Sequence, residues 1–294
     1  MDEDLLVLAV DIAQRLDADY AEARLHRTKE IGCLLRNGVP EPAVIGDAYG
    51  IGIRVIHSGS LAFSATNGIS KENIKNIVEN AVKRAKASSP LLKNKVLLSE
   101  EKSINVDWKA EEKKRIENIG FDDLFGLLKD IDYLIKDGKA DVSFPNRLFV
   151  SSTLLEEKVY MNSNGAMIKS RVPRVSFHSY ITTSHKGKTT TITIPSGYSQ
   201  LGESGGWEVI ERLKIFEYVQ KEAENLSLAV KSEQKPPKEI VDVILGPQVS
   251  GIIAHESAGH PGEADRILGR EAAQAGESYL KPDDLGIKIG SKEA

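Results

Sequence analysis

The apolar residues of this chain switch several times between helical and strand-like spacing, and this switching constrains the fold more than any other feature. Helical spacing occupies residues 5–16 and returns at 74–85, after Ser70, a residue type that caps helices. Strand-like segments lie between these two helices, at 21–26, 31–36, 50–56 and 61–64. A helix, several antiparallel strands and a second helix are typical of a compact α+β unit, which we expect over residues 1–90.

A second set of elements occupies the middle of the chain. A helix is expected after Asp122, and a helix is also expected over residues 209–226. Strands are predicted between them at 148–153, 157–161, 175–183 and 188–194. The polar segment that precedes this set carries mixed charges at 109–115, a pattern that favours a solvated connector. We therefore predict a central domain over residues 91–231, consisting of a helix and an antiparallel strand meander.

Two consecutive prolines, Pro236 and Pro237, interrupt a polar stretch over residues 231–238 and indicate a linker. After it, residues 240–245 read as a strand, and Pro247 is placed to begin a helix. Residues 286–290 look like a strand with nothing to pair with. We predict that residues 239–294 are the start of a second, mixed α/β catalytic domain that is incomplete.

Composition narrows the classes of protein that remain. Of the 294 residues, 40% are hydrophobic and 28% are charged, which is a globular balance. The net charge of −4 provides no basic field for nucleic acid, so no nucleic-acid partner is expected. The acidic N-terminus and the short apolar runs predict neither a signal peptide nor a membrane span, hence a cytoplasmic protein. A single cysteine, Cys33, excludes an internal disulfide framework and a multi-cysteine metal site.

The most informative motif is His255-Glu256-Ser257-Ala258-Gly259-His260. Its two histidines are five residues apart, whereas the common zinc-hydrolase motif places them four apart on one helix face. On a regular helix a spacing of five turns the two side chains about 140° away from each other. The helix must therefore widen by one π-type turn or end at Gly259 for both imidazoles to reach one ion.

The motif combines the residue types that zinc hydrolases use. Neutral imidazoles hold the metal, and a nearby glutamate takes a proton from water and returns it to the leaving amine. The alternative interpretation is a helix with two surface or capping histidines. Glu263 and Asp265 are either a further ligand, partners that orient an imidazole, or ordinary solvated carboxylates.

Together with four other segments, this motif resembles the TldD/PmbA metalloproteases, specifically the TldD side, which carries His-Glu-x-x-x-His. The other segments are Ala21-Glu22-Ala23-Arg24, Leu35-Arg36-Asn37-Gly38, Gly50-Ile51-Gly52-Ile53-Arg54-Val55 and Ala62-Phe63-Ser64-Ala65-Thr66-Asn67. The resemblance implies a cytoplasmic peptidase that hydrolyses unfolded or short peptides inside a dimer. It implies His255 and His260 as ligands of a metal, taken to be zinc, and Glu256 as the general base.

One departure from the family pattern matters for function. The TldD pattern takes its third metal ligand from a cysteine far downstream, and this sequence contains no residue that matches it. We therefore expect a C-terminally truncated member, alone as a homodimer or in a heterodimer with a PmbA/TldE-like subunit. The rival interpretation is a non-catalytic subunit that binds a partner or peptides without cleaving them.

Overall fold

The computed structural model describes residues 3–41, 44–136, 141–195, 201–232 and 237–292. The chain divides into two compact units, Met1–Ser232 and Glu233–Ala294, and each is described separately. Residues 233–236 of the predicted linker lie outside the described ranges. Within those ranges, no helix combines the length and apolar character that crossing a bilayer requires.

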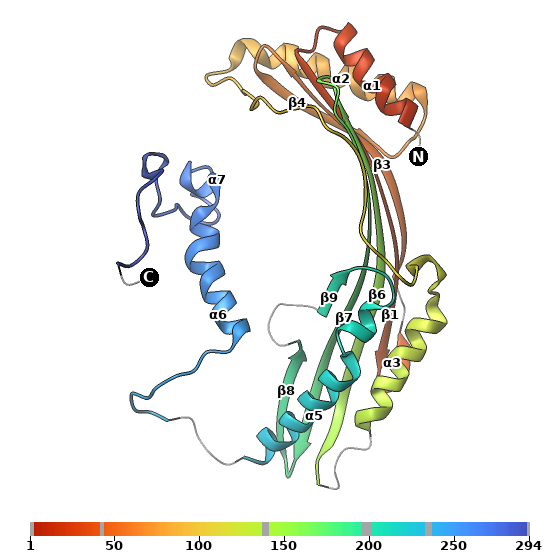
Figure 1. The fold of residues 1–294 in the computed structure, drawn as a ribbon, viewed down its shortest axis with the longest axis vertical. Coiled ribbons are helices and arrows are strands. Elements are labelled where there is room, and N and C mark those ends of the chain that lie inside the picture. The colour runs from red at the N-terminus through yellow and green to blue at the C-terminus, as the bar shows by residue number, and fades with distance from the viewer. Residues whose placement is uncertain (1–2, 42–43, 137–140, 196–200, 233–236, 293–294) are drawn as a thin grey trace. The chain divides into compact units, whose positions relative to one another are not determined.

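The first unit is an α+β structure organised by one nine-stranded sheet (Figure 1). Its central path runs β4-β3-β1-β6-β7-β5, with β2 paired to β1 and both β8 and β9 paired to β7. All pairs are antiparallel except that of β5 with β7. The strands are β1 Tyr20–Arg36, β2 Val39–Glu41, β3 Ile45–His57, β4 Ser60–Thr66, β5 Asn105–Lys109, β6 Ser143–Asn162, β7 Met167–His185, β8 Lys188–Ile194 and β9 Leu201–Ser204.

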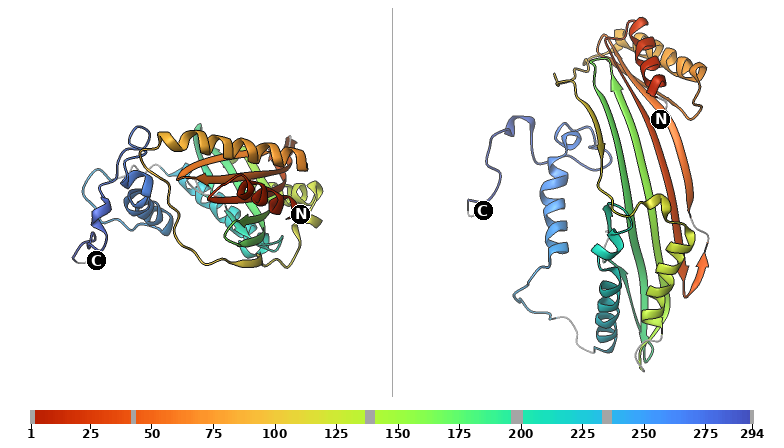
Figure 2. Two further views of the ribbon diagram at one scale, coloured as in Figure 1. Left: turned by 90° about the horizontal axis from the view of Figure 1, so that it is seen from above. Right: turned by 45° about the vertical axis from the view of Figure 1, so that its right-hand side comes forward.

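Helices cover one face of this sheet at both ends of its long strands. Helices α1 and α2 lie at one end, and α3 and α5 lie at the other (Figures 1 and 2). The buried residues of β1 explain this: Ala21, Ala23 and Leu25 pack under α1 and α2, while Cys33 and Leu35 pack with α3 and α5. All five have odd numbers, so they project from one face. The helices are α1 Glu3–Arg15, α2 Lys71–Ser88, α3 Phe121–Lys136, α4 Val209–Arg212 and α5 Ile215–Lys231.

Strand β1 is longer than its sequence pattern predicts. The segments expected separately at 21–26 and 31–36 form one strand, although Lys29 and Glu30 interrupt the apolar alternation. The strand continues because β3 and β6 pair with it on both sides through this charged stretch without a shift in register. The backbone hydrogen bonds of two neighbours therefore outweigh the local pattern.

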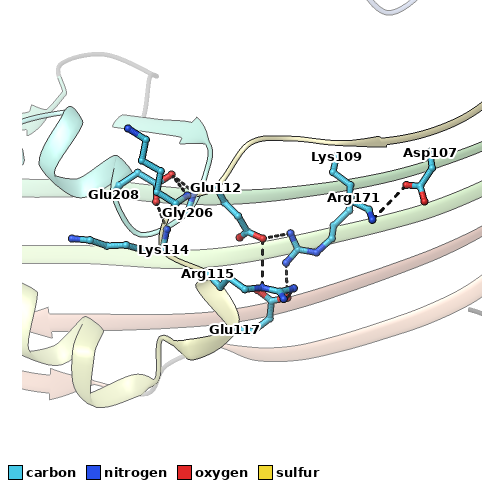
Figure 3. A network of polar contacts seen from close by, with 10 residues as sticks. Asp107, Lys109, Glu112, Lys114, Arg115, Glu117, Arg171, Gly206 and Glu208 are labelled. Atoms are coloured by element: carbon cyan, nitrogen blue, oxygen red, sulfur yellow. Dashed lines mark hydrogen bonds and ion pairs between the residues drawn. The ribbon is translucent and has the colours of Figure 1, made fainter.

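The segment expected to be a solvated connector is partly buried against the sheet. It contributes β5, and Glu112 from its charge run is only 12% exposed. Figure 3 shows the reason: the guanidinium of Arg171 on β7 donates to Glu112 and, over 2.5 Å, to Glu117. The prediction of a solvated connector thus holds for most of the charge run, and Glu112 is the exception because it pairs with the strand-borne Arg171.

The helix predicted over residues 209–226 is divided in two. Lys214 has a φ of 48°, in the left-handed region, and it separates α4 from α5. Val209 and Val219 are buried as the apolar spacing predicts, whereas Leu213 and Phe216, on either side of the break, are only partly buried and Ile215 is buried instead. The left-handed residue therefore shifts which side chains face the core next to the break.

The second unit contains α6 Pro247–Ala254, a π-helical turn His255–Gly259 and α7 Ala264–Ile267. The strand predicted at residues 240–245 is wrong, because none of these residues has regular structure. Ile240 and Ile244 are fully exposed. A strand needs a neighbour for its backbone hydrogen bonds, and no strand forms within residues 237–292. Residues 286–290 are irregular for the same reason.

Removing the buried cation of the pair between Asp132 and Arg147 should destabilise the first unit strongly. The two side chains are 5% and 9% exposed and meet at 2.7 Å. Arg147→Leu should cost about 3–5 kcal/mol in urea unfolding, because it leaves a buried carboxylate unpaired. The matched control is Arg27→Leu, which breaks an equally short but exposed pair with Asp47 and should shift the midpoint little. An equal loss of unfolding free energy in the two variants would contradict the claim that burial makes the pair of Asp132 and Arg147 important for stability.

Glu208 should stabilise the first unit at neutral pH and lose that effect in acid. Partial burial raises its pKa, but hydrogen bonds from the amides of Lys113, Lys114 and Gly206 outweigh this and lower the pKa to about 2 (Figure 3). Because the folded-state pKa lies below the unfolded value of 4.5, the contribution is complete above pH 4.5 and disappears as the pH falls toward 2. The difference in unfolding free energy between wild type and Glu208→Gln should shrink over that window; a difference that grows in acid would refute it.

Candidate metal centre

The two histidines of the motif lie on either side of a π-helical turn. Gly246 precedes α6, and Pro247 occupies its first turn, where the missing N–H costs nothing. The helix then widens over His255–Gly259, and the amide of His260 donates to the carbonyl of His255. This i→i+5 bond adds one residue to the turn, so the histidines return to the same side of the helix. One of the two helix defects expected from the spacing is therefore present.

The side chains of His255, Glu256 and His260 converge. The Nε2 atoms of the two histidines are 3.0 Å apart, and their ring centroids are 4.4 Å apart with planes at 78°. A carboxylate oxygen of Glu256 lies 3.8 Å from His260 Nε2. Among the described residues, these three form the group whose possible ligand atoms all lie within 4.8 Å of one another.

Glu263 orients the imidazole of His260. Its Oε1 lies 2.8 Å from His260 Nδ1, and its Oε2 lies 2.8 Å from Nε of Arg266. The hydrogen bond to His260 lowers the pKa of Glu263, so the carboxylate is ionised at neutral pH and accepts a hydrogen bond from Nδ1–H. This arrangement leaves the Nε2 lone pair of His260 directed at His255. Of the two carboxylates that the sequence left open, Glu263 thus orients an imidazole, and Asp265 is not part of the convergent group.

Two contacts tie the turn to the residues that follow it. The hydroxyl of Tyr279 donates to the carbonyl of Ser257 over 3.1 Å, and Ser278 Oγ donates to the carbonyl of Pro261 over 2.6 Å. They satisfy carbonyl groups that a widened helix end leaves without intrahelical partners. Neither residue shows a recognisable signal in the sequence, because Ser278 and Tyr279 become relevant only when the chain folds back onto the turn.

The imidazole nitrogens and the carboxylate of this group are atoms that bind divalent metal ions. Two imidazole nitrogens 3.0 Å apart are close enough to bind one ion at the usual zinc–nitrogen distance of about 2.0–2.1 Å. The group contains two imidazoles, whereas catalytic zinc sites take three ligands from protein. His255 and Glu256 are exposed and His260 is half-buried, so the group lies on the surface of its unit.

The remaining histidines make local contacts in the first unit. His57 Nδ1 lies 2.7 Å from the carbonyl of Asp17, and His185 Nδ1 lies 2.5 Å from that of Asp141. His178 packs edge-on against Tyr180 with ring centroids 4.6 Å apart. Cys33 is a free thiol buried in the core of the first unit.

Comparison with known proteins gives a consistent result. Residues 21–85 match the PmbA/TldA metallopeptidase domain 1, and residues 114–230 match the PmbA/TldA metallopeptidase central domain. The chain is 25% identical over 278 residues to a metalloprotease of Methanocaldococcus jannaschii, covering 93% of this chain and 56% of that protein. It is 26% identical over 297 residues to a metalloprotease of Methanothermobacter thermautotrophicus, covering 97% and 57%. The chain thus spans little more than half the length of these relatives.

A solved structure supports the same fold. The structure of TldE from Thermococcus kodakarensis superposes with a TM-score of 0.56 at 15% sequence identity. The match covers 75% of this chain and 47% of the TldE chain. At this identity the similarity concerns the α+β architecture alone.

Removing the acceptor behind His260 should weaken metal binding. Glu263→Gln replaces an ionised acceptor with a neutral amide, and loss of such an outer partner typically lowers metal affinity by about 10–100-fold. Calorimetric zinc titration of the 294-residue chain measures the effect. Glu271→Gln, which removes a carboxylate outside the convergent group, is the control and should bind zinc as the wild type does. Unchanged affinity in Glu263→Gln would mean that the carboxylate does not position the ring.

Proposed function

The chain belongs to the PmbA/TldA metallopeptidase family, and we propose that His255, Glu256 and His260 form the metal site of a peptidase. The observation that carries this proposal is the convergence of the three side chains across the π-helical turn. An irregular spacing that nevertheless brings both imidazole nitrogens within 3.0 Å is what two ligands of one ion require. The same feature has no evident use in a helix with two unrelated surface histidines.

In the proposed site each residue has a separate task. His255 and His260 hold the ion through Nε2, and Glu263 keeps the ring of His260 in the required orientation. A divalent ion held there supplies a Lewis acid that polarises the scissile carbonyl. Glu256 is placed beside the ligands, and its carboxylate takes a proton from the attacking water and returns it to the leaving amine nitrogen. Zinc is the proposed ion, because imidazole ligands and non-redox hydrolysis suit it.

The convergent group supplies two nitrogens, so we propose that a third protein ligand completes the site from outside it. The family resemblance assigns that ligand to a downstream cysteine. On the same basis we propose unfolded or short peptides as substrates, a cytoplasmic location and a dimer, either of this chain or with a PmbA/TldE-like subunit. The free, buried Cys33 suits a reducing compartment.

A second candidate function is a subunit that binds a partner or peptides without cleaving them. Two observations favour it for the 294-residue chain: the two imidazoles are one protein ligand fewer than catalytic zinc sites use, and His255 and Glu256 are exposed to solvent. The two candidates differ in one property. A peptidase requires the metal for turnover, whereas binding alone does not.

The test separates metal binding from catalysis in two variants. We expect His255→Ala to lose stoichiometric zinc and Glu256→Gln to retain it, because Glu256 is assigned to proton transfer. Both should lose chelator-sensitive hydrolysis of a fluorogenic peptide, measured on the protein expressed from its own gene. The 294-residue chain alone should bind zinc with a Kd above about 1 μM, because two imidazoles leave the geometry incompletely set.

Elemental analysis and the peptide assay together decide between the outcomes. Loss of zinc in Glu256→Gln would show that this carboxylate is a ligand. Hydrolysis that survives a chelator would contradict the peptidase proposal, and so would zinc that stays bound in the His255→Ala variant. Stoichiometric zinc in a protein that hydrolyses no peptide would favour the non-catalytic candidate.

A further inference from the structure

The sheet face opposite the helices carries a hollow that the proposed metal site does not use. It has a volume of about 350 Å³ and is lined by residues of β1, β3, β4 and β6. The lining includes Arg24 and His26 of β1 and Phe63 of β4. Its size falls in the range of small-ligand pockets, about 300–1,000 Å³. The hollow lies entirely in the first unit.

The glycines of the segment Gly50-Ile51-Gly52 create this hollow. In the register of the sheet Gly52 lies opposite Arg24, and Gly50 lies opposite His26. A Cβ at Gly52 would lie 3.1 Å from the ring of Phe63, and one at Gly50 would lie 3.0 Å from Oδ1 of Asn67. Side chains at either position would therefore occupy or close the hollow. Paired glycines on one strand face let other groups approach the backbone closely, and here the ring of Phe63 approaches Gly52 and the side chain of Asn67 approaches Gly50.

The charges around the hollow leave one cation without a partner. The carboxylate of Glu22 is neutralised: Arg54 Nε lies 3.2 Å from its Oε1, and the hydroxyls of Tyr20 and Tyr160 donate to its Oε2 over 2.7 and 3.0 Å. The guanidinium of Arg24, by contrast, forms no ion pair or hydrogen bond within the described part of the chain. His26 has a pKa lowered chiefly by burial, so it is uncharged at neutral pH and adds no second positive charge.

These observations define the ligand by its chemistry. A guanidinium matches a carboxylate through two parallel hydrogen bonds. With Glu22 paired to Arg54, the guanidinium of Arg24 is the single uncompensated charge, and one monoanion balances it. Phe63 is 58% exposed, and its ring offers an apolar surface at the edge of the hollow. Ala48 and Ala65 add further small apolar lining.

We propose that this hollow binds a peptide carboxylate next to an apolar side chain, with the carboxylate at Arg24 and the apolar group against Phe63. The proposal concerns the first unit and does not depend on the metal site. It assigns Arg24 a role in binding a ligand, because this exposed side chain contributes nothing to the buried core.

Calorimetry on the 294-residue chain, with EDTA present, tests this proposal. The probes are N-acetyl-Leu-Phe as the free acid and as its C-terminal amide, and we expect the acid to bind at least ten-fold more tightly than the amide. N-acetyl-Asp-Phe-amide distinguishes the source of the carboxylate. If it binds like the acid, any carboxylate beside an apolar group is recognised, and if it binds like the amide, the hollow recognises peptide C-termini.

Variants locate the binding site. Arg24→Gln should reduce the affinity for the acid to that for the amide, and Ala65→Leu, at an exposed position, should block binding by filling the hollow. The control is Arg36→Gln, which removes a guanidinium from the same face near the other end of β1 and should bind the acid normally. Equal binding of acid and amide, binding of inorganic phosphate as tight as that of the acid, or unchanged affinity in Arg24→Gln would each overturn the proposal.

Discussion

Backbone pairing of β1 with both of its neighbours determines the layout of the first unit. Strand β1 pairs with β3 over twelve residue pairs and with β6 over fifteen, without a break in either register. A shift by one residue would exchange the buried and exposed faces, so this register decides which side chains the helices cover. It buries Ala23 and Leu25 under α1 and α2, and it leaves Arg24 and His26 on the face that contains the hollow.

The second unit depends on a different local constraint. The hydrogen bond from the amide of His260 to the carbonyl of His255 adds a residue to one helical turn. Without that extra residue, imidazoles five positions apart would point in different directions. Contacts from Ser278 and Tyr279 stabilise the turn, and Glu263 fixes one of the two rings. A helix irregularity thus makes the motif a possible metal site.

Much of this structure could be predicted from the residues, and the exceptions have physical causes. The amphipathic helices and most strands follow from the spacing of apolar residues, and the π-helical turn was one of two defects that the spacing of His255 and His260 required. The burial of Glu112 could not be predicted, because its partner Arg171 lies on a distant strand. Residues 240–245 have a strand-like pattern but no neighbouring strand, and a pattern without a partner does not form a strand. The proposed division of the first unit near residue 90 stays a prediction, and β1 pairs with strands on both sides of that boundary.

The central claim is that both imidazoles of the motif bind the same ion. A crystal of the 294-residue chain grown with zinc, with diffraction recorded on both sides of the zinc absorption edge, tests it directly. We expect one anomalous peak at about 2.0–2.1 Å from Nε2 of both His255 and His260. Separate peaks at the two rings would contradict the claim. So would a zinc ion bound elsewhere while the two Nε2 atoms stay 3.0 Å apart with no ion between them.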